Sequence, residues 1–121
     1  MTKNIIKEKS FNFALRVIKL HKYLINEKKE FVLSKQLLRS GTAIGALVRE
    51  SEYAESKADF VHKLAIALKE ANESEYWLEL LYYEEYIDQK GYNSIVADLK
   101  EILKLLISII NSTKNNLKTE K

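Results

Sequence analysis

The stretch IVADLKEILKLLISII, residues 95–110, carries the clearest structural signal in the chain. Its apolar side chains recur at intervals of four, three, four and three, at Ile95, Leu99, Ile102, Leu106 and Ile109. This spacing places them on one side of an α-helix in the manner of a coiled-coil seam, whereas a strand would alternate every two residues. The pattern predicts a helix over about 94–112 with Asn93 as its cap, and a polar tail over 113–121 that we expect to fray.

Two helical patterns open the chain. The first covers about 10–24 and begins at Ser10, whose hydroxyl can cap a free backbone N–H. The second covers about 31–53 and includes Tyr53 among its core candidates. Both show apolar residues three and four positions apart, which is the period of a helix that buries one side.

The third pattern has the most distinct start. Ser56 and Asp59 have the spacing of a capping box, with Asp in place of the usual Glu. The apolar stripe that follows predicts a helix of about 30 residues to Ile87. Gly91 lies shortly afterwards and is the expected C-terminal stop of this helix.

Composition supports a wholly helical chain of 121 residues with no proline, three glycines and 46% apolar residues. Proline and glycine are the main helix breakers, so few positions require a helix to stop. We therefore predict an all-α fold, an antiparallel up-down-up-down four-helix bundle in a single domain over 1–121, with an ordered core at about 8–112.

The middle of the second helix, residues 40–46, reads SGTAIGA and holds six small residues in seven. Each glycine weakens a helix by about 1 kcal/mol relative to alanine, so a compensating contact is expected. Because small side chains let another helix approach closely, we expect Gly41, Thr42, Gly45 and Ala46 to form a helix-packing or oligomer interface. The alternative is a kink or short loop that divides this helix.

The third helix contains a dense aromatic run, YWLELLYY at 76–83. Its apolar residues cover too much of the helix circumference for one core-facing stripe, so part of the run is either buried on several sides or forms an oligomer contact. We expect Tyr76 and Trp77 to contribute to such a contact. Together with the small residues of the second helix, this pattern favours a homo-oligomer over a monomer.

Charge is distributed unevenly along the chain. Residues 1–40 hold ten Lys and Arg against three Asp and Glu, which gives +7; residues 41–92 hold five against eleven, which gives −6; and residues 93–121 hold five against three, which gives +2. The basic segment either faces an anion such as RNA or DNA, or pairs with the acidic segment within or between chains.

If nucleic acid is the partner, the sequence offers phosphate contacts rather than base readout, because no known recognition motif is present. The candidate phosphate-binding residues are Arg16, Lys19, Lys22, Arg39 and Arg49. Phe11 and Tyr23 could add stacking against bases.

Enzymatic chemistry is not expected. The chain has no cysteine and no glycine-rich phosphate loop. Asp59 and His62 give half of a di-metal bundle motif, and one half is not a site, so we expect no catalytic residue, no metal and no cofactor. No apolar segment reaches the roughly 20 residues that a membrane span needs, and no signal peptide is visible, so we expect a cytoplasmic protein.

Two linked blocks resemble the four-helix-bundle proteins encoded in intervening sequences of bacterial 23S ribosomal RNA genes. The first block is RSGTAIGA at 39–46, followed by Glu50 and AESKADF at 54–60. The second block is IALKEANE at 66–73 with YWLELL at 76–81. With shorter matches at 11–14 and 37–40, the resemblance covers about residues 8–110.

This resemblance implies a bundle that assembles as a homopentameric, barrel-like ring. It also implies kinship with the accessory variability proteins of diversity-generating retroelements, whose basic rings engage nucleic acid and a reverse transcriptase. The intervening-sequence branch has no established biochemical activity. Two positions depart from the family pattern: Leu47 replaces the usual Asn and loses its amide hydrogen bonds, and Ser51 replaces the usual Ala.

Two hypotheses follow from the sequence. The first is a non-enzymatic homo-oligomer that binds structured nucleic acid, or a nucleic-acid enzyme such as a reverse transcriptase, through a basic surface. The second is a purely structural or protein-binding bundle with no nucleic-acid affinity, whose basic side is neutralised by the acidic third helix of a neighbouring subunit.

Overall fold

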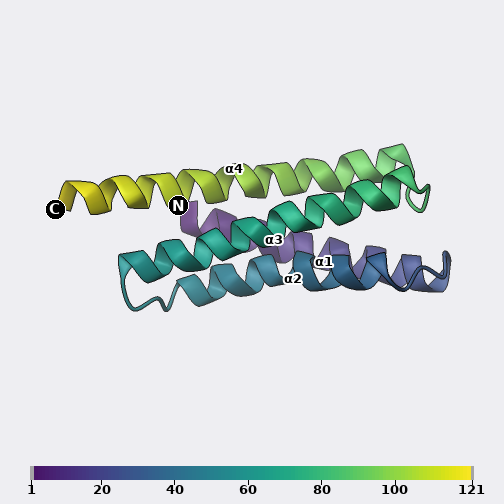
Figure 1. The fold of residues 1–121 in the computed structure, drawn as a ribbon, viewed down its shortest axis with the longest axis horizontal. Coiled ribbons are helices and arrows are strands. Elements are labelled where there is room, and N and C mark those ends of the chain that lie inside the picture. Colours follow the sequence, from purple (N-terminus) through teal and green to yellow (C-terminus); the bar gives the residue numbers. More distant parts are fainter. Residues whose placement is uncertain (1, 121) are drawn as a thin grey trace.

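The computed structural model describes residues 2–120, with side chains for residues 5–116, and this range contains four α-helices and no strand. The helices are α1 (Thr2–Asn26), α2 (Leu33–Ser51), α3 (Lys57–Tyr83) and α4 (Gln89–Glu120). They lie side by side, and the α1–α2 and α3–α4 connections lie at the same end of the molecule (Figure 1). The prediction of an all-α fold is confirmed.

Each helix buries one side against two neighbours. α1 packs on α2 and α4, and α3 packs on α2 and α4, so the core lies between the four helices. The predicted seam of α4 is confirmed, because its five residues are all buried: Ile95, Leu99, Ile102, Leu106 and Ile109. Phe13, Leu37 and Leu78, from the other three helices, are fully buried in the same cluster.

α1 begins two turns earlier than the sequence predicted. Ser10 is not an N-cap: it lies inside α1, is fully buried, and donates its hydroxyl to the carbonyl oxygen of Lys7 at 3.1 Å. Ile6, Ser10, Phe13 and Val17 recur at four, three and four, and all are buried. A serine on a buried stripe has the same local appearance as a serine before a helix, which explains the error.

The small residues of α2 do not interrupt it, since α2 is a continuous helix from Leu33 to Ser51, and the predicted alternative of a kink or loop is wrong. A Cβ at Gly41 would lie 2.8 Å from Cγ2 of Val17, and one at Gly45 would lie 3.4 Å from the carbonyl oxygen of Ser10. Both glycines therefore allow α1 to approach α2 within the chain. Thr42 is half-buried and bonds the Leu38 carbonyl oxygen at 2.7 Å, whereas Ala46 is exposed.

The start of α2 is held by an acidic side chain that sequence reasoning missed. The carboxylate of Glu30 accepts hydrogen bonds from the backbone N–H groups of Val32, Leu33 and Ser34, at 3.2, 3.0 and 2.7 Å. Negative charge at a helix N-terminus is favourable, and α2 accordingly begins at Leu33 rather than near 31. At the other end Tyr53 lies beyond the helix and is 85% exposed, so its assignment to the core is wrong.

The predicted cap of α3 is confirmed, because the Ser56 hydroxyl accepts from the N–H of Asp59 at 3.0 Å. The predicted stop is wrong. α3 ends at Tyr83, and the chain reverses at Glu85, whose φ of 66° is left-handed, while the Tyr86 N–H donates to the Leu81 carbonyl oxygen at 2.9 Å. This is the usual glycine-type helix end made without glycine, so composition could not reveal it.

Gly91 and Asn93 both lie inside α4, which begins at Gln89. The side chain that satisfies its first turn is Asp88, whose Oδ1 accepts from the Gly91 N–H at 2.7 Å, so the prediction of Asn93 as the cap is wrong. At its other end α4 continues to Glu120 instead of ending near Ser112. The predicted tail over 113–121 falls partly outside the described residues, which include side chains only to residue 116.

Candidate nucleic-acid interface

Arg16, the first predicted phosphate contact, forms an ion pair and hydrogen bonds within the chain. Its Nη1 lies 2.6 Å from Oδ2 of Asp98 on α4 and donates to the carbonyl oxygen of Ser94 at 3.2 Å. Its Nη2 donates to the Ser94 hydroxyl at 2.9 Å. This side chain therefore ties α1 to α4, and its charge is largely neutralised.

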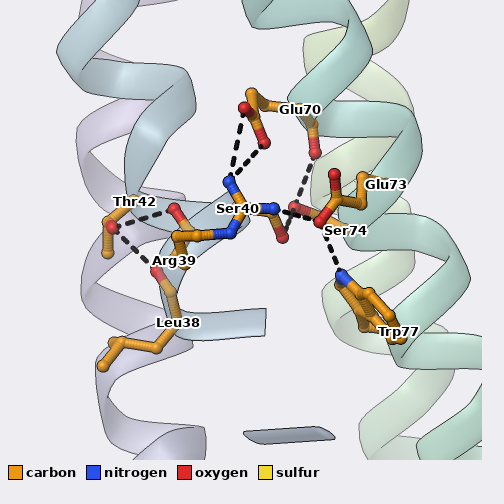
Figure 2. A network of polar contacts seen from close by, with 8 residues as sticks. All are labelled: Leu38, Arg39, Ser40, Thr42, Glu70, Glu73, Ser74 and Trp77. Carbon is orange, nitrogen blue, oxygen red and sulfur yellow. Dashed lines mark hydrogen bonds and ion pairs between the residues drawn. The ribbon is translucent and has the colours of Figure 1, made fainter. Parts of the chain in front are cut away.

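Arg39 is also held by ion pairs within the chain, on another side of the bundle. From α2 it forms ion pairs with Glu70, at 3.2 Å between Nη1 and Oε1, and with Glu73 on α3 (Figure 2). The hydrogen bond to Glu73 raises the pKa of Arg39 further above its ordinary value. Next to these ion pairs, the hydroxyls of Ser40 and Ser74 are buried and lie 2.8 Å apart. The Ser74 hydroxyl also donates to the Glu70 carbonyl oxygen.

The contacts of Glu73 extend the network to Trp77, whose indole Nε1 donates to Oε2 of Glu73 at 3.0 Å (Figure 2). That hydrogen bond, followed by the one from Arg39, holds the pKa of the Glu73 carboxyl below its ordinary value. The residues involved come from the two sequence blocks at 39–46 and 66–81. Those blocks lie far apart in the chain and meet across α2 and α3.

The contact between Glu73 and Trp77 predicts a pH-dependent change in the fluorescence of Trp77, the single tryptophan. Because the folded-state pKa of Glu73 is lowered, its contribution to stability is present above the unfolded value and is lost as pH falls through the folded value. We expect the Trp77 fluorescence to change in an acid transition centred below the ordinary glutamate pKa of 4.5. In Arg39→Gln the midpoint should move upward.

Helical circular dichroism over the same pH range is the control, since it separates protonation of Glu73 from unfolding. A fluorescence midpoint at or above the ordinary glutamate pKa in the unsubstituted protein, with the helices intact, would contradict the assigned contact.

The remaining three predicted phosphate contacts lie on α1 and α2. Lys19 and Lys22 are exposed on α1 and form no ion pair with any described residue. The guanidinium of Arg49 lies 5.4 Å from the centre of the Phe11 ring, which is a cation–π contact. Among the described residues, therefore, Lys19 and Lys22 are unpaired and Arg49 contacts an aromatic ring. Arg16 and Arg39 are paired, on different sides of the bundle.

Two further cations were not singled out by sequence reasoning. Lys28 and Lys29 lie in the α1–α2 connection, are exposed, and have no ion-pair partner within residues 5–116. The charge of +7 over residues 1–40 was the signal that could have found them. They extend the unpaired positive charge from α1 to the end of the bundle.

The exposed side of α1 is also apolar. Phe11, Leu15 and Ile18 follow one another at four and three positions, and they are 48, 44 and 36% exposed. An exposed apolar stripe of this kind is typical of a contact surface.

Of the aromatic pair predicted to form an interface, Tyr76 is 55% exposed, whereas Trp77 is half-buried and packs against the core.

The described residues contain no group of three or more His, Cys, Asp and Glu side chains that could hold a metal ion. His21 lies with Nδ1 3.3 Å from the Ser34 carbonyl oxygen, and His62 is exposed on α3. Within the same part of the chain, no helix combines the length and the apolar character that crossing a membrane requires.

The fold and this surface define a class of protein: a four-helix bundle with a polar α2–α3 contact and with cationic and apolar side chains exposed along α1. The model of the 23S rRNA-intervening sequence protein family matches residues 2–108, so the chain belongs to that family. The predicted family resemblance is confirmed.

A crystal structure agrees with this assignment. It is that of a protein of unknown function from the S23 ribosomal protein family of Bacteroides thetaiotaomicron, which is 62% identical to this chain. The match covers 92% of this chain and 99% of the other, with a TM-score of 0.91. Among proteins with curated descriptions, none matches the sequence significantly.

Proposed function

We propose that this protein is a non-enzymatic module in which an antiparallel up-down-up-down bundle assembles into a homo-oligomer and binds nucleic acid by its phosphates. The observation that carries the proposal is the pair of exposed lysines on α1, Lys19 and Lys22, which have no ion-pair partner in the part of the chain that the structure describes. A cation already held by a carboxylate gains little by moving to a phosphate, whereas an unpaired lysine loses no partner.

The exposed apolar stripe of Phe11, Leu15 and Ile18 supports self-association, because contact with another subunit would remove these side chains from water. A pentamer is the assembly that the family resemblance implies. In such a ring every subunit contributes its own lysines, so phosphate contacts multiply with subunit number and strengthen binding by avidity. A reverse transcriptase or another nucleic-acid enzyme is the protein partner that the same resemblance implies.

The test is binding of the purified, nuclease-treated protein to labelled structured RNA and duplex DNA across a salt series. We expect the logarithm of the binding constant to fall linearly with the logarithm of the salt concentration. The slope should be about −0.9 per phosphate neutralised on duplex DNA. Lys19→Glu/Lys22→Glu should make the slope shallower and reduce affinity about tenfold or more, since each subunit loses two cations and gains two anions.

The matched control reverses two exposed lysines of α4, Lys104→Glu/Lys114→Glu, which gives the same change in net charge on another helix. If both double variants weaken binding equally, net charge rather than the α1 surface is responsible. If the unsubstituted protein binds neither nucleic acid at low salt, the proposal fails, and the alternative of a structural or protein-binding bundle takes its place.

A further inference from the structure

A pocket is lined by residues of the α1–α2 and α3–α4 connections, which lie at the same end of the bundle (Figure 1). Its volume is about 690 Å³. Four of its lining side chains are tyrosines, Tyr23 from α1 and Tyr82, Tyr83 and Tyr86 from the end of α3 and the chain that follows. Lys28 also lines it. None of these residues takes part in the α2–α3 network.

The tyrosines form a partly fixed aromatic wall. Tyr82 stacks on Tyr92 of α4, with ring centres 4.5 Å apart and an angle of 11° between planes. Tyr83 meets Tyr82 edge to face at 5.4 Å. Tyr82 is therefore held from both sides, while Tyr83 and Tyr23 are 74 and 43% exposed and leave aromatic surface uncovered. The left-handed turn at Glu85 also lines the pocket.

A second, more apolar pocket of about 330 Å³ adjoins the first along α1 and α4. The two share Ile87 in their linings, and Arg16 and Lys19 line the second. Lys19 precedes Tyr23 by four residues, so the two side chains are neighbours on the surface of α1. Two cations without an ion-pair partner among the described residues therefore lie near the tyrosines, Lys19 on α1 and Lys28 in the connection.

The charges inside the tyrosine pocket indicate which part of a nucleotide would enter it. Lys28 is accompanied there by Glu85 and Asp88, so the lining is not positive overall. A phosphate would gain little inside, whereas a neutral base has faces that stack on tyrosine and edge groups that can donate to carboxylates. Phosphates flanking that base would reach Lys19, which lies beside the pocket on α1, and Lys28, whose exposed side chain belongs to the lining.

We infer that the tyrosine pocket receives an unpaired base of a single-stranded or looped nucleic acid, with the base against Tyr23 and Tyr83 and the flanking phosphates at Lys19 and Lys28. This inference rests on the proposed function and names its ligand more closely, since bases stacked within a duplex are not free to enter. The protein should bind unstructured strands more tightly than duplex of equal length.

The experiment measures affinity for a fluorescently labelled, unstructured 12-nucleotide adenosine-rich RNA and for a duplex of the same length. Tyr83→Ala and Tyr23→Ala should each weaken binding to the single strand by about fivefold or more, and should change duplex binding little. Tyr83→Phe should restore single-strand affinity, because it keeps the ring. The control is Tyr53→Ala, which removes an 85% exposed tyrosine beyond the end of α2, outside this pocket.

Circular dichroism and unfolding curves of each variant confirm that the bundle is intact, which is expected for exposed side chains. Equal affinity for single strand and duplex, with no loss in Tyr83→Ala, would overturn the pocket assignment while leaving phosphate binding through α1 in place. Absence of binding to both nucleic acids would overturn the proposed function and this inference together.

Discussion

Replacing Phe13 by alanine should lower the free energy of unfolding by about 3–5 kcal/mol, which is the usual cost of deleting a buried aromatic side chain. Phe13 is fully buried on α1 and belongs to the cluster that all four helices share. Its removal leaves a cavity between packed helices. Urea unfolding followed by circular dichroism measures this loss. If the free energy of unfolding depends on urea concentration with the same slope in both proteins, the substitution has changed stability rather than the compactness of the unfolded state.

Phe11, two residues earlier on the same helix, is the matched control for Phe13. It is 48% exposed and contacts Arg49, so Phe11→Ala should cost about 1 kcal/mol or less. Its effect should appear instead in the mass of the assembly in solution, because Phe11 belongs to the apolar stripe proposed for self-association. Equal losses of stability in the two variants would mean that the side of α1 facing the core is wrongly assigned.

The second large effect is expected at Gly41, where α1 approaches α2. Gly41→Leu should destabilise the fold by about 3 kcal/mol or more, because even the Cβ would lie 2.8 Å from a methyl group of the buried Val17. The sequence predicted that the small residues of α2 form a helix-packing or oligomer interface. Gly41 and Gly45 both pack against α1 within the chain, so a leucine at either position should separate α1 from α2 before it affects any oligomer.

Alanine distinguishes the two glycines. At Gly45 a Cβ would be 3.4 Å from the Ser10 carbonyl oxygen, an ordinary contact, so Gly45→Ala should stabilise by roughly 0.5–1 kcal/mol through helix propensity. At Gly41 the same gain is opposed by the clash with Val17, and the net effect should be a loss of up to about 2 kcal/mol. Thermal or urea unfolding compares the stabilities of the two alanine variants. A Gly41→Ala variant that is more stable than Gly45→Ala would contradict the packing described here.

Helix ends show where sequence reasoning stops. Ser56 and Ser10 have the same local signature of a cap, but the first caps α3 and the second is buried where Gly45 approaches it. Gly91 was the natural stop for α3, and the chain turns instead at Glu85. In each case the side chain's role depends on a neighbouring helix or on a turn whose usual residue is absent.

The candidate site shows the same division. The basic character of residues 1–40 was evident, and Lys19 and Lys22 are exposed as a phosphate contact requires. The pairing of Arg16 with Asp98, 82 positions later, and of Arg39 with Glu70, 31 positions later, was not evident. Ion pairs across helices depend on which helices are neighbours and on their relative rotation, and neither quantity is local.

The amino-acid sequence by itself determined the helical content, the buried seam of α4, the cap of α3 and the family, because each depends on spacing along a few turns or on short contiguous blocks. Only the tertiary structure decided which charges remain unpaired, that the glycines of α2 face α1, and that four tyrosines from two distant segments line one pocket. The physical reason is that helix formation follows local periodicity, whereas neutralisation, close approach and concavity arise where separate helices meet.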